Sequence, residues 1–162
     1  VGIRERRQAR RSAQVCRKAV GIAPKTAQWR ANLAHVLATL QRYEESAAEY
    51  RRALAIRPDT PGAESDLGMV LYNNDDAEGG IRHLRRAVRA NPDDGLSRLR
   101  LGTMLHYEGH HTEAIEHLRA ATELQPASAD AHGTLAMALN AAGHTEEAQQ
   151  ELELAQRYGA KP

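Results

Sequence analysis

The sequence contains no phenylalanine and a single cysteine, Cys16, in 162 residues. One cysteine excludes an internal disulfide framework and any zinc knuckle built from cysteines. Aromatic residues make up 4% of the chain and hydrophobic residues of all kinds 41%, so the core must be built from Leu, Ala, Val and Ile. This composition favours closely packed helices.

Excess charge and long apolar runs are also absent. The net charge of +1 does not predict a nucleic-acid partner, and no apolar stretch is long enough to span a bilayer or resembles a signal peptide. We therefore expect neither nucleic acid nor membrane as a partner, and a cytoplasmic location. A periplasmic location stays open because the sequence starts at Val1 rather than Met. The sequence leaves the oligomeric state open.

Residues recur at a spacing of 34 along almost the whole chain. Repeats of this length are typical of stacked helical hairpins. Within each period, apolar residues return every three or four positions, a turn interrupts them, and the rhythm resumes, which predicts helix, turn and helix. The recurring residues are Pro24, Pro58, Pro92 and Pro126; Ala19, Ala53, Ala87, Ala121 and Ala155; Leu33, Leu67, Leu101 and Leu135; and Leu37, Leu71, Leu105 and Leu139.

Two further columns hold only small residues, which predicts that two helices touch closely there. These columns are Ala34, Gly68, Gly102 and Ala136, and then Ser46, Gly80, Ala114 and Ala148. A proline follows each second helix, where it forces the preceding residue out of helical geometry. We predict an all-α fold of nine helices, with a remnant second helix in residues 1–26 and complete hairpins at 27–60, 61–94, 95–128 and 129–162.

The outer face of each second helix predicts where the array ends. Stacked repeats bury this face against their neighbours, so the end of a stack needs a polar one. Two positions of this face, seven residues apart, recur in each second helix. They hold the apolar Ile81 and Val88 in one repeat and the polar Gln149 and Gln156 in the last. We expect the array to end near residue 162 and the amino end to be a cut inside a larger array or protein.

The columns of leucine, small residues and alanine, with Gly109 in a turn and the closing prolines, resemble the tetratricopeptide repeat family. The resemblance implies a right-handed superhelix, an α-solenoid, whose first helices line a concave groove that holds a partner's extended segment or helix. Two departures stand out. Asp75 and Asp76 replace the usual turn glycine, and the fourth position of each hairpin, usually aromatic in the family, holds Arg30, Glu64, Arg98 and His132.

The function that this resemblance implies is a scaffold that binds a protein or peptide. No glycine-rich phosphate loop, nucleophile elbow or metalloprotease motif occurs, so we expect no catalysis and no cofactor. The alternative is the regulatory or substrate-docking arm of a larger enzyme, as tetratricopeptide arrays are in some glycosyltransferases.

Helical spacing selects the first-helix positions that the leucine columns leave facing away from the core, and these are the predicted ligand-binding residues. Asparagine can hydrogen-bond a peptide backbone, tyrosine and methionine give adaptable apolar contact, and arginine can bind a carboxylate. Tyr72, Arg100 and Tyr107 are the expected anchors. Some of the others, Met69 and Met137 especially, could instead pack between hairpins. The full set is Asn32, His35, Thr39, Asp66, Met69, Tyr72, Asn73, Arg100, Thr103, His106, Tyr107, Thr134, Met137 and Asn140.

The carboxylate-clamp subfamily of tetratricopeptide co-chaperones provides a specific comparison. It holds acidic carboxyl-terminal peptides through Lys, Asn and Arg residues at defined positions. Those positions hold Ala31, His35, Asp66, Leu96 and Arg100 here, and only Arg100 fits. We therefore expect no specific affinity for such peptides.

Two other clusters could bear a site. His106 and His110 have the four-residue spacing of paired metal ligands, but Gly109 interrupts the helix and no tetrahedral ligand set lies nearby, so we predict no metal site and interpret His110 and His111 as a solvated turn. Basic residues also recur along the second helices and predict either a phosphate-binding ridge or a solvated face. This ridge comprises Arg17, Lys18, Arg51, Arg52, Arg85, Arg86 and Arg119, extended at the amino end by Arg4, Arg6, Arg7, Arg10 and Arg11.

Overall fold

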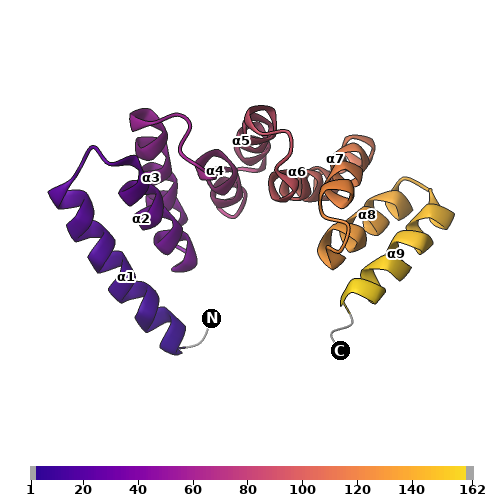
Figure 1. Ribbon diagram of the computed structural model, residues 1–162, viewed down its shortest axis with the longest axis horizontal. Coiled ribbons are helices and arrows are strands. Elements are labelled where there is room, and N and C mark those ends of the chain that lie inside the picture. The colour runs from indigo at the N-terminus through magenta and orange to yellow at the C-terminus, as the bar shows by residue number, and fades with distance from the viewer. Residues whose placement is uncertain (1–2, 160–162) are drawn as a thin grey trace. The chain divides into compact units, whose positions relative to one another are not determined.

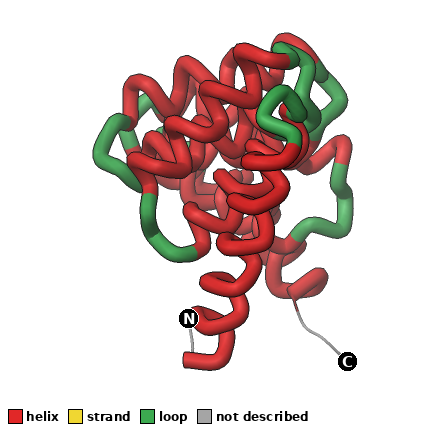
Figure 2. Tube along the Cα trace, turned by 90° about the vertical axis from the view of Figure 1, so that its left-hand side faces the viewer, coloured by secondary structure: helices red, strands yellow, loops and turns green. Residues whose placement is uncertain are grey.

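The computed structural model describes residues 3–159, which form nine helices joined by short loops, with no strand in this span (Figures 1 and 2). This confirms the predicted all-α fold of helical hairpins. None of the described helices is both long enough and apolar enough to cross a membrane. The helices are α1 (Ile3–Ile22), α2 (Ala27–Thr39), α3 (Tyr43–Ile56), α4 (Ala63–Tyr72), α5 (Ala77–Ala90), α6 (Gly95–Tyr107), α7 (His111–Leu124), α8 (Ala129–Ala141) and α9 (Thr145–Gly159).

The helices belong to two compact units, and the division falls within α5, between His83 and Leu84. The first unit contains α1, the hairpin α2–α3, α4 and the first half of α5. The second unit contains the rest of α5 and the hairpins α6–α7 and α8–α9. Each unit therefore contains at least one complete hairpin.

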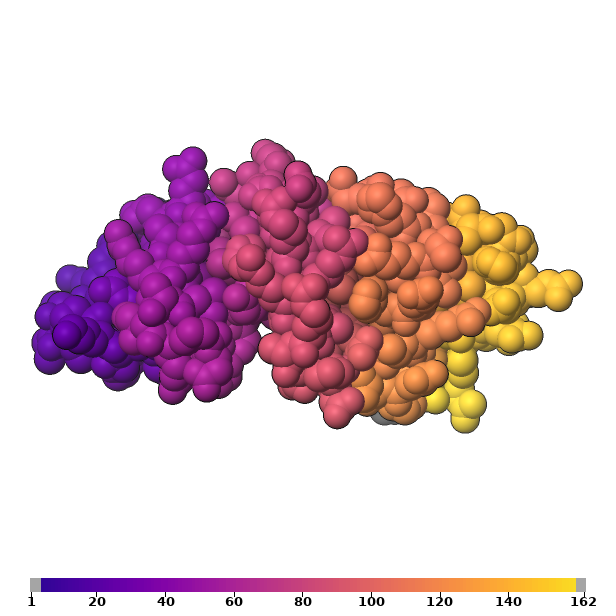
Figure 3. Space-filling view, turned by 90° about the horizontal axis from the view of Figure 1, so that it is seen from above, coloured from indigo at the N-terminus to yellow at the C-terminus, as the bar shows by residue number. Residues whose placement is uncertain are grey.

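In the first unit, α1 packs against the hairpin that follows it, and their side chains are in direct contact in the space-filling view (Figure 3). Ala13 and Cys16 from α1 form a buried cluster with Leu33 and Leu37 from α2. A second cluster joins α2, α3 and α4, and Tyr50 is its largest fully buried side chain. The helix α1 thus occupies the place that a second helix takes before the next hairpin.

In the second unit, the predicted leucine columns form the core. Leu101, Leu105, Leu118, Leu135 and Leu139 are all fully buried or nearly so. Because these residues come from α6, α7 and α8, the hairpin α6–α7 and the first helix of the next hairpin share one apolar interior. This confirms the assignment of the leucine positions to the core.

The small-residue columns lie where helices approach most closely, as predicted. A Cβ atom added at Gly102 would lie 2.5 Å from Cγ of Leu118, and one added at Gly80 would lie 2.8 Å from the carbonyl oxygen of Gly68. In the first hairpin the Ser46 hydroxyl donates a 2.7 Å hydrogen bond to the carbonyl oxygen of Ala34. A larger residue in either column would push the two helices of a hairpin apart.

The turns inside the hairpins share one backbone conformation despite their different residues. Gln41, Asp75, Gly109 and Gly143, spaced by 34 residues, all have φ between 60° and 87°. The amide that follows the turn residue then donates to a carbonyl near the end of the first helix, as Asp76 does to Leu71 at 2.9 Å. The loss of glycine at Asp75 therefore leaves the turn geometry intact, although a side chain at such φ values costs conformational energy.

Candidate functional site

The first helices of the first unit, α2 and α4, together with Asn73 directly after α4, carry seven of the predicted binding residues, and none of these seven is buried. Asn32 accepts a 2.9 Å hydrogen bond from the amide of Gln28. On α4, Asp66 accepts a 3.2 Å hydrogen bond from the Tyr50 hydroxyl of α3. The first helices therefore bury one face in the core and present another that is at least partly open to solvent.

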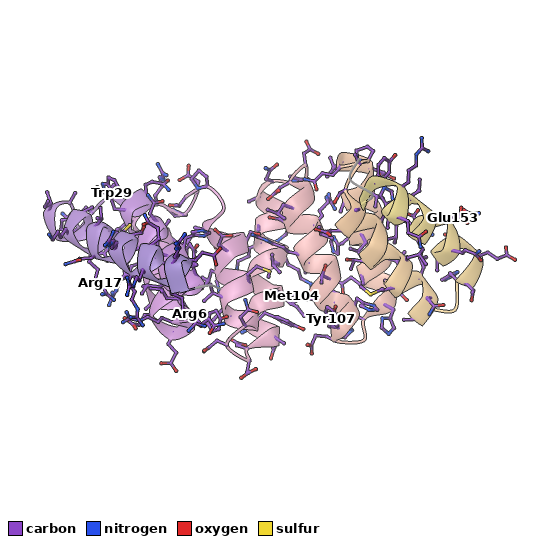
Figure 4. The ribbon with its side chains drawn as sticks, turned by 90° about the horizontal axis from the view of Figure 1, so that it is seen from below. Arg6, Arg17, Trp29, Met104, Tyr107 and Glu153 are labelled. Carbon is purple, nitrogen blue, oxygen red and sulfur yellow. The ribbon has the colours of Figure 1, made fainter. Side chains whose placement is uncertain are left out.

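In the second unit, α6 and α8 carry the other seven, again with none buried. Met104 and Tyr107 show the two faces of α6, because Met104 is 2% exposed and Tyr107 is 62% exposed (Figure 4). The hydroxyls of Thr103 and Thr134 donate to carbonyls four residues earlier in their own helices, at 2.7 and 2.8 Å.

The fourteen predicted binding residues fall into an exposed group and a partly buried group. Met137 belongs to the exposed group, so it does not pack between hairpins, whereas Met69 is partly buried. The exposed group is His35, Thr39, Asn73, Tyr107, Met137 and Asn140. The partly buried group is Asn32, Asp66, Met69, Tyr72, Arg100, Thr103, His106 and Thr134.

Side-chain pairs between the two helices of a hairpin, each with a glutamate as one member, were missed by sequence reasoning. Arg30 of α2 donates to Glu49 of α3 at 2.9 Å, and His132 of α8 lies 2.6 Å from Glu151 of α9. Both pairs join residues 19 apart, and the first member is the position that is usually aromatic in the family. The fixed separation of 19 residues is the one signal in the sequence that marks such positions, but only the packing of the two helices shows that the side chains meet.

The second and third hairpins differ at these two positions, because the second has its acid on the first helix and the third has no acid there. Nδ1 of His83 lies 2.6 Å from a carboxylate oxygen of Glu64, so in this hairpin the acid is on the first helix. In the third hairpin Arg98 is paired by position with His117, which cannot supply a carboxylate. Arg98 instead donates to the carbonyl oxygen of Pro92 at 2.6 Å.

Acidic side chains neutralise part of the basic ridge. Arg17, Arg85 and Arg119 each reach a glutamate 28 residues later, at the start of the next second helix. The distances are 3.7 Å to Glu45, 2.9 Å to Glu113 and 2.5 Å to Glu147. These exposed pairs add little stability, but they lower the free positive charge and favour the solvated-face interpretation.

Of the two histidines interpreted as a solvated turn, His110 is exposed as expected, whereas His111 is partly buried. His111 begins α7 and lies beside His106, with 5.1 Å between the ring centroids and 50° between the ring planes. Burial, followed by the nearby His111, lowers the pKa of His106 below its usual value. Among the described residues, no group of three or more His, Cys, Asp or Glu side chains is arranged to hold a metal ion. His106 thus joins the rings of Tyr107 and His111 in one cluster of aromatic side chains.

Antiparallel helical hairpins repeated at a fixed spacing, each with one buried and one open face on its first helix, define a helical-repeat scaffold. Three tetratricopeptide-repeat sequence models match the chain, at residues 34–75, 65–106 and 105–162. Together they cover all four hairpins except the start of the first. The chain belongs to the tetratricopeptide repeat family.

Several solved structures share this fold. YrrB, described as a tetratricopeptide repeat protein with an unusual peptide-binding site, is 24% identical, with a TM-score of 0.77 over 94% of this chain and 78% of its own. Pseudomonas aeruginosa pilF is 22% identical, with a TM-score of 0.86 over 98% of this chain and 72% of its own. MamA from Desulfovibrio magneticus is 17% identical, with a TM-score of 0.79 over 95% and 94%. No curated protein matches the chain.

These similarities establish the fold and the general role. The protein has the architecture of a scaffold for protein–protein interaction, a type of fold that is not itself catalytic. Identities below 25% carry no information about the partner.

Proposed function

We propose that the chain holds an extended segment or a helix of a partner protein on its first-helix face, meaning the fourteen residues defined above, which lie on α2, α4, α6 and α8 and, for Asn73, directly after α4. The observation that carries this proposal is the division of these helices into two faces. The leucines of the two repeating columns, which begin at Leu33 and Leu37, are buried, whereas none of the fourteen is. A surface that the fold does not need for its own core is available for a ligand.

The side chains on this face favour a largely neutral peptide that carries one acidic residue. Asn32, Asn73 and Asn140 can donate to and accept from a peptide backbone without regard to its sequence. Tyr107 and Met137 are exposed apolar contacts, and methionine adapts to different partner shapes. The guanidinium of Arg100 is the group that would bind the acidic residue.

Tyr72, Arg100 and Tyr107 are the proposed anchors, because aromatic residues and arginine contribute most to the energy of interfaces. They differ in how cleanly they can be tested. Tyr107 is largely exposed, so its side chain adds little to the core. Tyr72 and Arg100 are partly buried and have contacts within the protein. Tyr107→Ala is therefore the decisive substitution.

The test begins with a library of displayed peptides selected on the purified chain, from which one peptide is synthesised and its affinity measured by calorimetry. Tyr107→Ala, Tyr72→Ala and Arg100→Ala should each weaken binding by about 1 kcal/mol or more, which is about a fivefold loss of affinity. Circular dichroism of each variant shows whether the helices are intact.

Arg51→Ala and Arg119→Ala are the matched controls, because they remove exposed side chains of the second helices. They should leave the affinity unchanged. If the three anchor variants bind as well as the parent while the controls abolish binding, the second-helix face is the functional one and the proposal is wrong.

A further inference from the structure

The amino-terminal half of α1 and the end of α2 enclose a small cavity that two arginines line. Its volume is about 80 Å³, and no acidic side chain lies on its walls. The walls come from Arg6 and Arg10 of α1 and from Thr39, Leu40 and Gln41, which end α2 and begin the turn after it. Arg6 is one of the labelled side chains in Figure 4. Because residues four apart are neighbours on a helix surface, the two guanidinium groups reach the cavity together.

This part of α1 has no counterpart in the other second helices. By the 34-residue spacing, Ala9 corresponds to the residues that begin α3, α5, α7 and α9. The helix α1 begins earlier, at Ile3, so that residues 3–8 extend it by more than one turn. Arg6 lies in this extension. The cavity thus depends on the extension of α1 and not on the repeat pattern.

The hydrogen-bond donors of the two arginines are not used within the described part of the protein. Arg17 of the same helix, in contrast, lies 3.7 Å from a carboxylate oxygen of Glu45. Among the described residues, neither Arg6 nor Arg10 donates a hydrogen bond or pairs with a carboxylate. The last carbonyl groups of α2 already accept hydrogen bonds from amides of the following turn. The donors of both arginines are therefore available for a ligand.

These donors match a phosphoryl group better than a carboxylate. Each guanidinium can donate two parallel hydrogen bonds to one oxyanion, and the side-chain amide of Gln41 in the cavity wall can donate as well. A carboxylate has a single charge and two oxygens, and one guanidinium is enough to bind both. A phosphoserine has three terminal oxygens and a charge of about −1.5 to −2 at pH 7. Arg6 and Arg10 together therefore suit the phosphoryl group.

The surroundings of the cavity favour a protein ligand over a membrane or a nucleic acid. Residues 4–11 consist of five arginines, one glutamate, one glutamine and one alanine. This half of the helix thus offers no large apolar side chain that could insert into a bilayer. No aromatic side chain lines the cavity to stack on a base. A protein segment is also the class of ligand that a scaffold for protein–protein interaction holds.

We propose that this cavity binds a phosphorylated serine or threonine in an extended segment of a partner protein, with Arg6 and Arg10 donating to the phosphoryl oxygens. Recognition of a phosphorylated segment by clustered arginines is a recurring mode of peptide binding. Thr39 belongs both to the cavity and to the first-helix face, but the two arginines belong only to the cavity. Substituting them leaves the proposed first-helix face unchanged, so either proposal can fail alone.

The probe is a short synthetic peptide with one phosphoserine between uncharged residues, and its comparison is the same peptide with unmodified serine. Titration into the whole chain at low salt, followed by nuclear magnetic resonance, measures the affinity. We expect saturable binding that is weakened about tenfold or more when the phosphoryl group is removed and that inorganic phosphate competes away. Arg6→Gln and Arg10→Gln should each weaken binding of the phosphopeptide about fivefold or more.

Arg7→Gln and Arg11→Gln are the matched controls, because they remove the same charge from exposed positions of α1 outside the cavity. They should change the affinity by less than about twofold, and circular dichroism of all four variants should match the parent. Equal losses in the four variants would overturn the inference, because net charge alone would then attract the peptide. Failure of the phosphopeptide to bind would also overturn it. So would tighter binding of a single-stranded oligonucleotide, or of vesicles containing phosphatidylserine, that depends on Arg6 and Arg10.

Discussion

The hairpins α2–α3 and α6–α7 come from different units but have helices of equal length, leucines at the same repeat positions and turns of the same conformation. They differ in the residues that form the turn and the polar contacts. The turn of the first places Gln41 at φ 60°, and the turn of the third places Gly109 at φ 83°. Glycine adopts such values readily, whereas a residue with a Cβ atom does not. The first hairpin therefore stores strain that the third avoids.

The polar contacts inside the two hairpins, in contrast, favour the first hairpin. The first hairpin has a carboxylate, Glu49, that accepts hydrogen bonds from both Arg30 and Arg52. The third has Arg98 beside His117, whose Nδ1 is buried without a hydrogen-bond partner. Each hairpin thus lacks one local stabilisation that the other has. The comparison teaches that the repeat fixes the apolar framework, while turns and polar contacts vary from one repeat to the next.

The largest expected effect tests whether the apolar framework is equivalent in the two hairpins. Leu37 and Leu105 occupy the same repeat position and are 2% and 0% exposed. Replacing either by Ala should lower the free energy of unfolding by about 2–5 kcal/mol, because the substitution removes buried methyl groups and leaves a cavity. Urea unfolding followed by circular dichroism measures both. A loss below about 1 kcal/mol in one hairpin would show that the two cores are not equivalent.

The turn difference should be removable by exchanging residues. Gln41→Gly should stabilise the protein by about 1 kcal/mol, because it relieves the left-handed conformation of a residue with a side chain. Gly109→Ala should destabilise it by about 1–2 kcal/mol for the converse reason. Thermal unfolding of both variants provides the comparison. If Gln41→Gly is neutral or destabilising, the strain assigned to this turn is absent.

A carboxylate at position 117 should reproduce the polar contact of the first hairpin in the third. His117→Glu places an acid opposite Arg98, as Glu49 stands opposite Arg30, and should raise the free energy of unfolding by about 1 kcal/mol at pH 7. The nearby Glu113 and Glu116 oppose this gain and Arg85 supports it. In an Arg98→Gln background the gain should disappear, and a gain that persists would show that the two residues do not pair.

The smallest expected effect is a pH dependence that arises from two histidines of the third hairpin. Burial is the main cause that lowers the pKa of His106 and of His117 below their usual value. At His106 the neighbouring His111 adds to this effect. At His117, Glu113 and Glu116 oppose it, and Arg98 and Arg85 add to it. The unfolded state therefore binds more protons than the folded state below about pH 6.5, so stability should fall as the pH drops through that value.

The double variant His106→Gln with His117→Gln should lose part of this dependence. Chemical unfolding of parent and variant at pH 7.5 and 5.5 measures it. Equal losses of stability in the two proteins on acidification would assign the effect to other groups.

The period of 34 residues was enough to predict the nine helices, the leucines that form the core and the small residues at close contacts. These features are local, because each depends on the face of one helix on which a residue lies. The open faces of the first helices could be predicted for the same reason. The left-handed turn at Gln41 is indicated only by its place in the period, since its own residue type does not favour such a turn.

The contacts that distinguish one repeat from another were decided only by the tertiary structure. Arg30 reaches Glu49, and Arg119 reaches Glu147, because neighbouring helices bring together side chains 19 and 28 positions apart. Likewise, Leu152 has the residue type of Leu118, but it stays exposed because no described helix packs over it. A sequence pattern determines which side of a helix is apolar. Only the packing of one helix on the next determines whether that side is covered and which charges meet.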